Sequence, residues 1–534
     1  MTAAPAPAPA AATPRPGGYP SPADWRDEVL YSVLLDRFDW AGVRQVEGDP
    51  ADGDSRHGGN LAGLTRRLDY LHRLGVTALL LSPVTRTAPD SYHGYSPVAL
   101  DEVDPRLGSL ADLVELIAQA HRRGIRVVLD LVLNHAGPVF DYADGNGWKP
   151  AGPGEIERWN HPLRPAGLGR PEHFSRRGII ADWKDPEQAS RGDFPPNLRR
   201  FATENPATRQ QLIRLACWWI ETADADGVRL DAIRHMDAEF VRQLCGALRR
   251  HAGGLGKRNF LVLGEYSATE DAPIAACLGT GIDTAFGYSE YRRQSWPLHA
   301  KAPAADLARS VTIARSAFGD RYEHLVRFID NHDVYRFLRE SEPESQLRPA
   351  LAFLLLSAGI PMLYYGTEQA FRQPTDRLER ECSADRAAPR NREDMFADGA
   401  FTSASSAGDR FDETSSTFRF ARRLIALRRR HPALRVGSQR QRFAEESGPG
   451  LYVISRHHGQ QGLLVAINTS ASPAAAQLPL LHHEVGHPEF VDLLNPRVRV
   501  PVRDGSQTIS LLAAGHQVLV LQSRPSSRHH HAAG

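Results

Sequence analysis

Short apolar runs alternate with segments of helical periodicity along most of this 534-residue chain, from about residue 29 to residue 369. Each run is rich in Val, Ile and Leu and has the length of a buried strand. Each intervening segment repeats its apolar residues three or four positions apart, which predicts an amphipathic helix. This order is typical of βα units that build a parallel sheet. The predicted strands are residues 29–35, 76–81, 125–133, 227–232, 260–265, 282–286, 325–329 and 360–365.

Several of the helical segments carry start signals. The apolar residues of 61–74 share one helical face. Asn205 followed by Pro206 predicts an N-cap with proline at the first helical position, and Asp237 predicts the start of a further helix. Eight strands that are each followed by a helix close most simply into a (β/α)8 TIM barrel, because an all-parallel sheet needs both faces covered. An open doubly wound sheet is the alternative fold.

The alternation breaks in two places. Residues 136–203 are rich in Gly, Pro, Trp and charge, which predicts an irregular subdomain inserted after the third strand, on the catalytic side. Short alternating runs at 450–455, 462–468 and 517–521 predict a C-terminal antiparallel β-sandwich. The expected domains are an Ala/Pro-rich disordered extension (1–20), a catalytic barrel (21–135 and 204–431), the inserted subdomain (136–203), the C-terminal β-sandwich (432–523) and a disordered tail (524–534).

Composition limits the function classes. The hydrophobic fraction of 41% is ordinary, and no apolar run approaches the roughly 20 residues that span a bilayer, so we expect a soluble protein. A net charge of +1 gives no field that would attract nucleic acid or an anionic membrane, which favours an uncharged partner. The N-terminus lacks the pattern of a signal peptide, and this predicts a cytoplasmic location. Cys217, Cys245, Cys277 and Cys382 lack metal-ligand spacing; buried free thiols are expected, with disulfides as the alternative.

Acidic residues end three of the predicted strands. Asp231 ends the fourth strand, Glu265 ends the fifth, and Asp333 follows the seventh. Because the reactive groups of a parallel barrel lie at the C-terminal ends of its strands, the three acids should converge on one face. Asp330 belongs to the same seventh-strand segment and competes with Asp333, since spacing alone does not separate them.

Neighbouring carboxyl groups suit hydrolysis of a glycosidic bond with retention, which needs two of them about 5 Å apart. Asp231 would be the nucleophile, because strand alternation puts Arg229 on the same side and would keep Asp231 ionised. Glu265 would be the general acid, and Asp333 would stabilise positive charge in the transition state. A divalent-metal site built from the same acids is the rival, which Arg229 disfavours because it would repel a second cation. Each acid taken alone could instead be a helix N-cap.

Four segments resemble the signature motifs of the α-amylase family, glycoside hydrolase family thirteen. They are residues 130–135 (DLVLNH), 227–235 (GVRLDAIRH), 263–265 (LGE) and 328–333 (FIDNHD), in the family's order. Further similarity lies at 31–38, 92–95 and 359–369, and the resemblance covers about 27–521. It implies Asp231 as nucleophile, Glu265 as acid/base and Asp333, rather than Asp330, as transition-state stabiliser.

The resemblance also implies a set of sugar-binding residues. By position they are His93, Tyr95, His135, Arg229, Arg234, His235 and His332. Tyr95 can stack on a sugar ring, and the imidazoles can hydrogen-bond its hydroxyls. Arg234 and His235 after the nucleophile resemble residues of enzymes that cut α-1,4-glucans, so an α-glucan or maltooligosaccharide is the expected partner. A transglycosylase or α-glucosidase of the same family is the alternative, and a non-catalytic sugar-binding relative is the remote one.

Calcium is a further implication of the resemblance, although the chemistry needs no cofactor. The family binds a structural calcium ion through the asparagine of the first signature, an acid of the inserted subdomain and the backbone of the histidine after the nucleophile. Asn134 and His235 fit this set, whereas Asn197 takes the place of the acid, with Asp193 nearby. Fewer charged oxygens predict weaker binding, so both readings stay open. The segment 391–395 resembles an acceptor-side loop or is only a surface loop.

Overall fold

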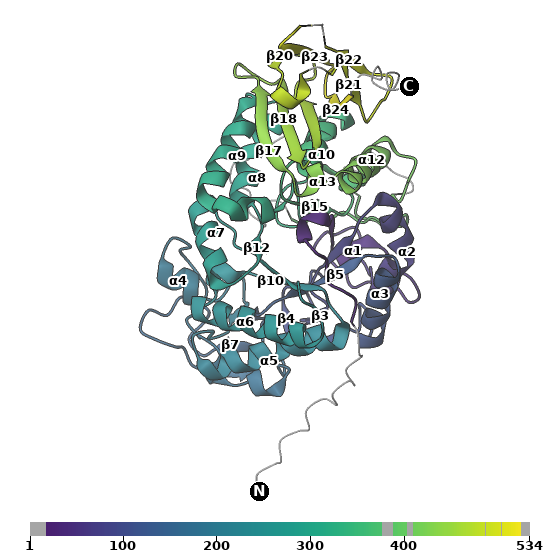
Figure 1. Cartoon of the computed structure of the whole chain (residues 1–534). Helices are drawn as coiled ribbons and strands as arrows, with labels where there is room; N and C mark the ends of the chain where they lie inside the picture. Colours follow the sequence, from purple (N-terminus) through teal and green to yellow (C-terminus); the bar gives the residue numbers. More distant parts are fainter. Residues whose placement is uncertain (1–17, 376–387, 403–409, 486, 503–504, 525–534) are drawn as a thin grey trace.

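The computed structural model describes residues 18–375, 388–402, 410–485, 487–502 and 505–524 (Figure 1). Within these residues, eight parallel strands form the central sheet. They are β1 (Leu30–Val33), β2 (Ala78–Leu81), β5 (Arg126–Leu131), β10 (Gly227–Leu230), β11 (Leu261–Gly264), β12 (Thr284–Ala285), β13 (Val326–Arg327) and β15 (Ile360–Tyr364). Each of them lies inside one of the predicted apolar runs.

The central sheet closes into a barrel. Its strands are ordered β12-β11-β10-β5-β2-β1-β15-β13, so strands that follow one another in the sequence are neighbours in space, and β1 pairs with β15. A parallel bridge between Phe286 and Val326 joins the two ends of this order. An open doubly wound sheet would keep two free edges. The prediction of a (β/α)8 barrel is therefore confirmed.

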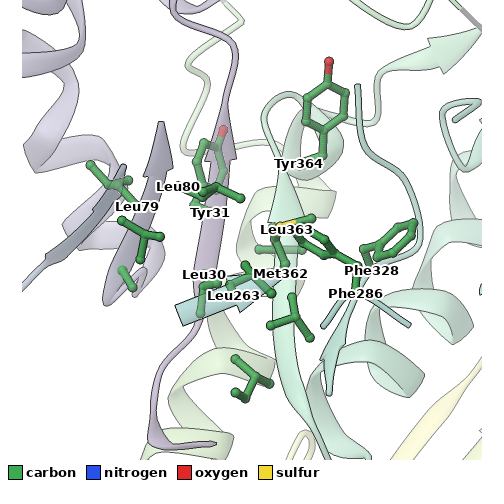
Figure 2. Packing of buried hydrophobic residues seen from close by; sticks show 14 of the residues in the cluster. Leu30, Tyr31, Leu79, Leu80, Leu263, Phe286, Phe328, Met362, Leu363 and Tyr364 are labelled. Atoms are coloured by element: carbon green, nitrogen blue, oxygen red, sulfur yellow. The ribbon is translucent and has the colours of Figure 1, made fainter. Parts of the chain in front are cut away.

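Large apolar side chains from different strands pack together in the core (Figure 2). Leu30, Leu263 and Met362 come from β1, β11 and β15, and all three are almost completely buried. Phe286 and Phe328 follow β12 and β13 and are buried in the same cluster. Close packing of branched and aromatic residues fixes the strand ends relative to one another, which is the precondition for a precise site.

The helices around the barrel start where their capping residues predict. α5 (Pro206–Ala223) begins with Pro206 at its first position, and the Asn205 side chain accepts a hydrogen bond from the N–H of Ala207. α6 (Ala238–Gly254) is capped in the same way by Asp237. The remaining helices of the barrel are α1 (Leu35–Phe38), α2 (Leu61–Leu74), α3 (Leu110–Arg122), α7 (Asp271–Cys277), α8 (Tyr288–Leu298), α9 (Ala305–Phe318), α10 (Leu347–Leu356) and α12 (Ser416–Arg430).

Several strands of the barrel are followed by enlarged connections. After β13 and β15 these carry β14 (Leu338–Arg339) and β16 (Arg372–Gln373), which pair with each other. β2 leads into the hairpin of β3 (Thr85–Thr87) and β4 (Pro97–Val103), and β5 leads into an irregular insertion. The insertion contains β6 (His135–Ala136), β7 (Phe140–Tyr142), β8 (Ile156–Trp159), α4 (Pro186–Arg191) and β9 (Arg199–Arg200). β6 pairs with β9, so the start and the end of the insertion lie side by side. The insertion after the third strand is confirmed, whereas its limits of 136–203 stay a prediction.

Two antiparallel sheets form the C-terminal region, at the top of Figure 1. The larger sheet is ordered β17 (Ser438–Ala444), β18 (Leu451–His458), β19 (Gln461–Asn468), β24 (Val518–Arg524), β21 (Glu489–Asp492) and β22 (Arg499–Pro501). The smaller sheet pairs β20 (Ala474–Pro479) with β23 (Thr508–Ala513). β18, β19 and β24 lie at the three predicted alternating runs. The expected C-terminal antiparallel domain is confirmed.

Both faces of β18 are buried, each in a different core. Tyr452 and Ile454 belong to the large core that includes the barrel. Leu451 and Val453 point to the opposite face and belong to a second core that also contains Ile509 of β23. This period-two alternation means that the larger sheet supports the barrel on one side and carries the smaller sheet on the other.

The predicted N-terminal extension and C-terminal tail lie mostly outside the described residues, as 1–17 and 525–534. Tyr19 belongs to the part that is described. Its ring stacks on His121 with centroids 4.2 Å apart, and its N–H donates to Asp224. The chain is therefore packed against the barrel from Tyr19 onward, one residue before the predicted limit of the extension.

The described cysteines are free thiols, as the sequence predicts. Cys245 and Cys277 are buried and Cys217 is partly exposed, whereas Cys382 lies outside the described residues. Among the described helices, none combines the length and the hydropathy needed to cross a bilayer.

Candidate active site

Adjacent strand ends bring Asp231 and Glu265 together. β10 and β11 pair in parallel with Leu230 opposite Gly264, and each acid is the residue that follows its strand. The N–H of Glu265 donates to the Leu230 carbonyl at 3.0 Å, which fixes the backbone of one acid against the strand of the other. Both carboxyl groups keep some exposure, 9% for the Asp231 side chain and 13% for that of Glu265. They are therefore neighbours that solvent still reaches.

One guanidinium group contacts both of these acids. Arg229 is 2% exposed, and its Nη1 donates to Asp231 Oδ1 at 2.8 Å while its Nη2 lies 3.0 Å from Glu265 Oε2. Nη1 also donates to both carboxylate oxygens of Asp130, at 2.8 and 2.7 Å. Arg229 thus lies on the same side as Asp231, as strand alternation predicts, and ties three carboxyl groups to one fixed cation.

Asp130 is a member of this cluster to which the sequence reasoning gave no role. It lies opposite Arg229 in the register of β5 and β10, and the hydroxyl of Tyr95 donates to its Oδ2 at 2.9 Å. A signal was present in the sequence, because a carboxylate inside a buried strand is costly unless a cation and hydrogen bonds compensate it. Such an acid predicts a buried cationic partner.

The backbone after Asp231 positions Glu265. Ala232 has a φ of 51°, in the left-handed region, and its N–H donates to Glu265 Oε2 at 2.8 Å. This conformation costs a residue other than glycine on the order of 1 kcal/mol, and it persists where surrounding structure enforces it. The strained turn therefore aims one donor at the carboxyl group beside Asp231.

Asp333 lies in a separate set of contacts in the same site. Its Oδ2 is 3.2 Å from Nε2 of His332, and its Oδ1 is 3.6 Å from Nη2 of Arg392. Its own N–H donates to Asn331 Oδ1 at 2.7 Å, which holds the turn after β13. The Asp333 side chain is 25% exposed, more than that of either other acid. Asp333 is thus fixed by cationic and polar groups while one part of it faces solvent.

Asp330, the competitor of Asp333, points elsewhere. It is 1% exposed, and its carboxylate accepts hydrogen bonds from the N–H of Phe337 and from the hydroxyl of Thr367. These bonds satisfy it as a structural residue. The rival reading of a divalent-metal site also loses support, since among the described residues no group of three His, Cys, Asp or Glu is arranged to hold a metal ion.

The surroundings of Asp231 and Asp333 shift the pKa values of these two acids in opposite directions. Burial raises the pKa of Asp231 above its ordinary value; the attraction of Arg229 opposes this, and the nearby Glu265 reinforces it. Burial alone would also raise the pKa of Asp333, but His332 and Arg392 outweigh it and lower that pKa. Arg229 therefore does not by itself make Asp231 an easily ionised acid, because its charge is shared with other carboxyl groups.

Four of the predicted sugar-binding residues form one continuous group beside the acids. The ring of Tyr95 stacks on His93 at 5.7 Å and on His332 at 5.2 Å, and His135 Nε2 lies 2.9 Å from the Tyr95 carbonyl oxygen. Burial lowers the pKa of His93 to about 3 and that of His135 to about 4. These two imidazoles are consequently neutral at physiological pH, so each has one donor and one acceptor nitrogen. His93 Nδ1 accepts from the N–H of Tyr95, and His135 Nε2 donates to the Tyr95 carbonyl.

Arg234 and His235 lie further out and contact different parts of the chain. Arg234 is exposed and donates to the carbonyl of Ser267 after β11. His235 Nδ1 is 2.6 Å from the carbonyl oxygen of Ala189 in α4, and its ring packs at 4.8 Å against Phe194. His235 therefore lies at the rim between the barrel and the insertion, and Arg234 lies beside the loop after β11.

Trp183 is an exposed aromatic residue at this rim that the sequence reasoning did not single out. It is 47% exposed, and its ring lies 5.6 Å from His235 and 5.4 Å from Phe194. An indole that stays exposed next to a polar rim can stack on a sugar ring. The only sequence signal was a tryptophan in a segment otherwise rich in Gly, Pro and charge.

The segment 391–395 is not a surface loop. Asn391 is completely buried, and its amide donates to the carbonyls of Asn331, His332 and Val334. Arg392 is 7% exposed and donates to the hydroxyl of Tyr92 and to the His332 carbonyl. The surface-loop reading is therefore wrong, because this segment holds the turn that carries Asp333. Its acceptor-side role stays a prediction.

The donor set predicted for calcium does not fit the ion. Asn134 favours a ligand, since its Oδ1 is buried and has no hydrogen-bond partner among the described residues. The other two members argue against it. Asn197 supplies an amide in place of a carboxylate, and the His235 carbonyl oxygen already accepts hydrogen bonds from Nε and Nη2 of Arg200 at 3.4 and 3.3 Å. This set brings no carboxylate, and the oxygen of one member is already occupied by a guanidinium, so it suits Ca²⁺ poorly.

A comparison with protein families agrees with this fold. Residues 49–437, more than half of the chain, match the family model described as "Alpha amylase, catalytic domain". The chain therefore contains the catalytic domain of a family of glycoside hydrolases. It belongs to the α-amylase family, as the resemblance of its four motifs predicts.

Curated relatives have similar names. The chain is 28% identical to "Beta/alpha-amylase" of Paenibacillus polymyxa, covering 84% of this chain and 34% of that protein. It is 28% identical to "Alpha-amylase" of Streptomyces lividans, covering 82% and 53% respectively. It is also 28% identical to "Neopullulanase 2" of Thermoactinomyces vulgaris, covering 83% and 70%. The chain spans about a third and about half the length of the first two relatives.

Solved structures of amylases have the same architecture. The α-amylase from Geobacillus thermoleovorans, solved with acarbose, superposes with a TM-score of 0.76 at 27% identity, over 94% of this chain and 99% of that one. An Anoxybacillus α-amylase superposes with a TM-score of 0.77 at 25% identity, over 95% and 100%. The similarity therefore includes the insertion and the C-terminal region as well as the barrel.

Proposed function

We propose that this protein is a retaining hydrolase of α-1,4-glucosidic bonds in starch-type glucans or maltooligosaccharides, with Asp231, Glu265 and Asp333 as its catalytic residues. The observation that carries the proposal is the pair Asp231 and Glu265, which leave adjacent strand ends and touch opposite nitrogens of the Arg229 guanidinium. Retention requires two carboxyl groups close enough to act on one glycosidic bond, one as the nucleophile and the other as the general acid.

The proposed reaction has two steps. Asp231 attacks the anomeric carbon as Glu265 gives its proton to the leaving glycosidic oxygen, so that a covalent glycosyl-enzyme forms and the shortened glucan departs. Glu265, now a carboxylate, removes a proton from water, whose oxygen attacks the anomeric carbon and releases Asp231. Asp333, kept ionised by His332 and Arg392, stabilises the positive charge that develops on the sugar in both steps.

The charge balance of the site supports a proton on one of the acids. Asp130, Asp231 and Glu265 all contact the single guanidinium of Arg229. Three carboxyl groups around one buried cation leave an excess of negative charge, so the cluster as a whole retains a proton more readily than isolated acids do. The proposed mechanism uses Glu265 as the proton donor, and the N–H of Ala232 and Nη2 of Arg229, which both contact its Oε2, fix that side chain beside Asp231.

The substrate class rests on the residues around the acids. The neutral imidazoles of His93 and His135 and the ring of Tyr95 suit the hydroxyls and the face of an uncharged sugar. Arg234, His235 and Trp183 would meet the sugars beyond the cleaved bond. The names of the relatives, amylase and neopullulanase, agree with a glucan.

Transfer to a second sugar, as in a transglycosylase or α-glucosidase, is the second candidate. The exposed Trp183 beside His235 favours it, because an aromatic platform next to the cleavage point could hold an acceptor sugar in competition with water. Hydrolysis and transfer share the same covalent intermediate and differ only in what attacks it.

A product analysis tests both candidates. Purified protein is incubated with maltoheptaose, starch, cyclodextrin, sucrose and trehalose, and the products are separated by chromatography while NMR records the anomer released first. Shorter maltooligosaccharides with an initial α anomer support the proposal. Products longer than maltoheptaose would favour transfer. A β anomer would contradict retention, and consumption of sucrose or trehalose alone would contradict the glucan assignment.

A further inference from the structure

A buried arginine occupies the junction at which the inserted segment meets the catalytic face. Arg200 ends β9, is 2% exposed, and pairs with His135 of β6 in the strand register. Its N–H donates to Asp193 Oδ1, and the N–H of the next residue, Phe201, donates to the carbonyl of Asn134. The backbone of this arginine therefore already joins two parts of the insertion to the end of β5.

The side chain of Arg200 reaches a third segment. Its guanidinium donates to the carbonyl of His235, which lies four residues beyond Asp231. The same group donates to the hydroxyl of Thr203 and to Glu204 Oε2. Thr203 in turn accepts a hydrogen bond from the N–H of Asp237 at the start of α6. One cation thus connects the insertion to the loop that follows the proposed nucleophile.

We propose that the guanidinium of Arg200 links the segments that a bound calcium ion would otherwise join here. The fold of this protein then does not depend on calcium. A calcium ion at this junction would link Asn134, the insertion and the His235 carbonyl. Arg200 links the same three segments through covalent chain and hydrogen bonds. The position at which the resemblance expects the acid holds Asn197. The buried Asp193 nearby is already bonded to the N–H of Arg200, to Arg199 and to the hydroxyl of Tyr142.

The charges around Arg200 agree with this role. Its partners are neutral oxygens of His235 and Thr203 and one carboxylate, that of Glu204. Burial lowers the pKa of Arg200, and the attraction of Glu204 opposes that effect. Glu204 and Asp193 both attract this guanidinium. A monovalent cation fixed by the chain therefore offsets the nearby acids, and the same guanidinium would repel a divalent ion at this place.

The first test uses the unaltered protein and needs no turnover. Thermal unfolding is recorded after dialysis against EDTA and again with millimolar CaCl2, and calcium binding is measured by isothermal titration calorimetry. We expect the two Tm values to agree within about 1 °C, with no binding heat, because a ligand that does not bind the folded state cannot stabilise it. A Tm that falls by several degrees in EDTA and recovers with CaCl2 would overturn the proposal.

The second test changes the charge at the junction. Asn197→Asp restores an acid, and Asn197→Asp combined with Arg200→Met also removes the guanidinium while keeping a long side chain. We expect CaCl2 to raise the Tm of the double variant by about 2 °C or more and to leave the single variant within about 1 °C. An equal response of both variants, or of neither, would contradict Arg200 as the group that excludes calcium.

A matched control separates the role of Arg200 from the general cost of losing a buried arginine. Arg199 is equally buried in β9, but its guanidinium contacts Phe140, Asn146 and Asp193 inside the insertion. Arg199→Met and Arg200→Met should both lower Tm, and only Arg200→Met should raise the KM for maltoheptaose, by roughly threefold or more, because it releases the His235 loop. Equal KM values would overturn the assignment to the loop. The Tm and calorimetric results hold whether or not the proposed glucan activity is correct.

Discussion

Two fully buried arginines, at opposite ends of the barrel strands, meet very different partners. Arg229 lies near the C-terminal ends, where its guanidinium contacts Asp130, Asp231 and Glu265. Arg428 of α12 lies near the N-terminal ends, where its guanidinium donates to five backbone carbonyls. These belong to Arg26, Leu355, Ser357, Gly359 and Leu434. The same type of side chain thus lies among acids at one end of the barrel and among backbone carbonyl oxygens at the other.

The electrostatics follow from these partners. Burial alone would lower the pKa of either guanidinium. At Arg229 the neighbouring acids, led by Asp130, outweigh burial and raise the pKa. At Arg428 burial is reinforced by repulsion from Arg456, and the pKa lies below its ordinary value. Burial of an arginine therefore does not reveal its role, whereas its partners do. Acids that share one cation mark reactive groups, and carbonyls that share one cation mark a clamp between segments.

Replacing the carboxyl group of Glu265 should have the largest effect of these changes, as a loss of kcat. Glu265→Gln keeps the shape of the side chain but cannot deliver or accept a proton. We expect kcat on maltoheptaose to fall by roughly 10² to 10⁴-fold. Tm should stay close to that of the parent, because the cluster loses one of several mutually repelling acids.

Initial-rate kinetics and thermal unfolding check this together. Glu239→Gln, an exposed acid at the start of α6, serves as the control and should change neither quantity. Turnover of the Glu265→Gln protein at the parent rate would remove Glu265 from the mechanism.

Replacing Arg428 should have the opposite effect to replacing Glu265, with a large loss of stability and little change in kcat. Arg428→Met leaves up to five carbonyl groups short of a donor, so the free energy of unfolding should fall by about 3 kcal/mol or more. The kcat at a temperature well below Tm should stay within about twofold, because the clamp lies away from the acids. Urea unfolding and kinetics at one temperature measure both, with Arg430→Met on the exposed face of α12 as control. A large loss of kcat in the folded variant would mean that the two ends are not independent.

A fall in pH should destabilise the folded protein through His135, which lies at the catalytic end of the barrel. Burial lowers the pKa of His135 to about 4 in the folded protein, against an ordinary value near 6.5. As pH falls below about 6.5, the unfolded chain takes up a proton that the folded protein does not, so stability decreases until about pH 4. At about pH 5.5 this one residue should cost about 1 kcal/mol.

Urea unfolding at about pH 7 and at about pH 5.5 measures the loss. In His135→Gln the difference between the two pH values should shrink by about that amount. If the loss of stability between the two pH values were the same in His135→Gln as in the parent, protonation of His135 would not be its cause.

The smallest expected effect lies at the outer rim of the catalytic end. Trp183→Ala should remove one stacking contact, which corresponds to a KM for maltoheptaose that is roughly two- to tenfold higher at unchanged kcat. Trp159 is the matched control, since it is a partly exposed tryptophan of the insertion that packs on Phe140 and Phe174 instead of His235. If Trp159→Ala raised KM as much as Trp183→Ala, the effect would reflect the fold of the insertion and not a sugar contact.

Local chemistry explains what could be predicted. The eight strands were recognisable because each is a short apolar run buried on both faces, and helix starts at Asn205 and Asp237 were recognisable because a cap needs only its own first turn. The convergence of Asp231 and Glu265 followed from one general rule about strand ends. The surface-loop reading of 391–395 failed because its burial depends on distant carbonyls that no local pattern reveals.

The amino-acid sequence by itself determined the barrel, the insertion after the third strand, the C-terminal sheets and the three acids, since periodicity and strand-end position are properties of neighbouring residues. Only the tertiary structure decided which acids share Arg229, that Asp130 joins them, and that Arg200 holds the junction where a calcium ion was one expectation. These outcomes depend on contacts between segments far apart in the chain, and electrostatic interactions act through space, so their sign and strength follow from distance and burial and not from sequence order.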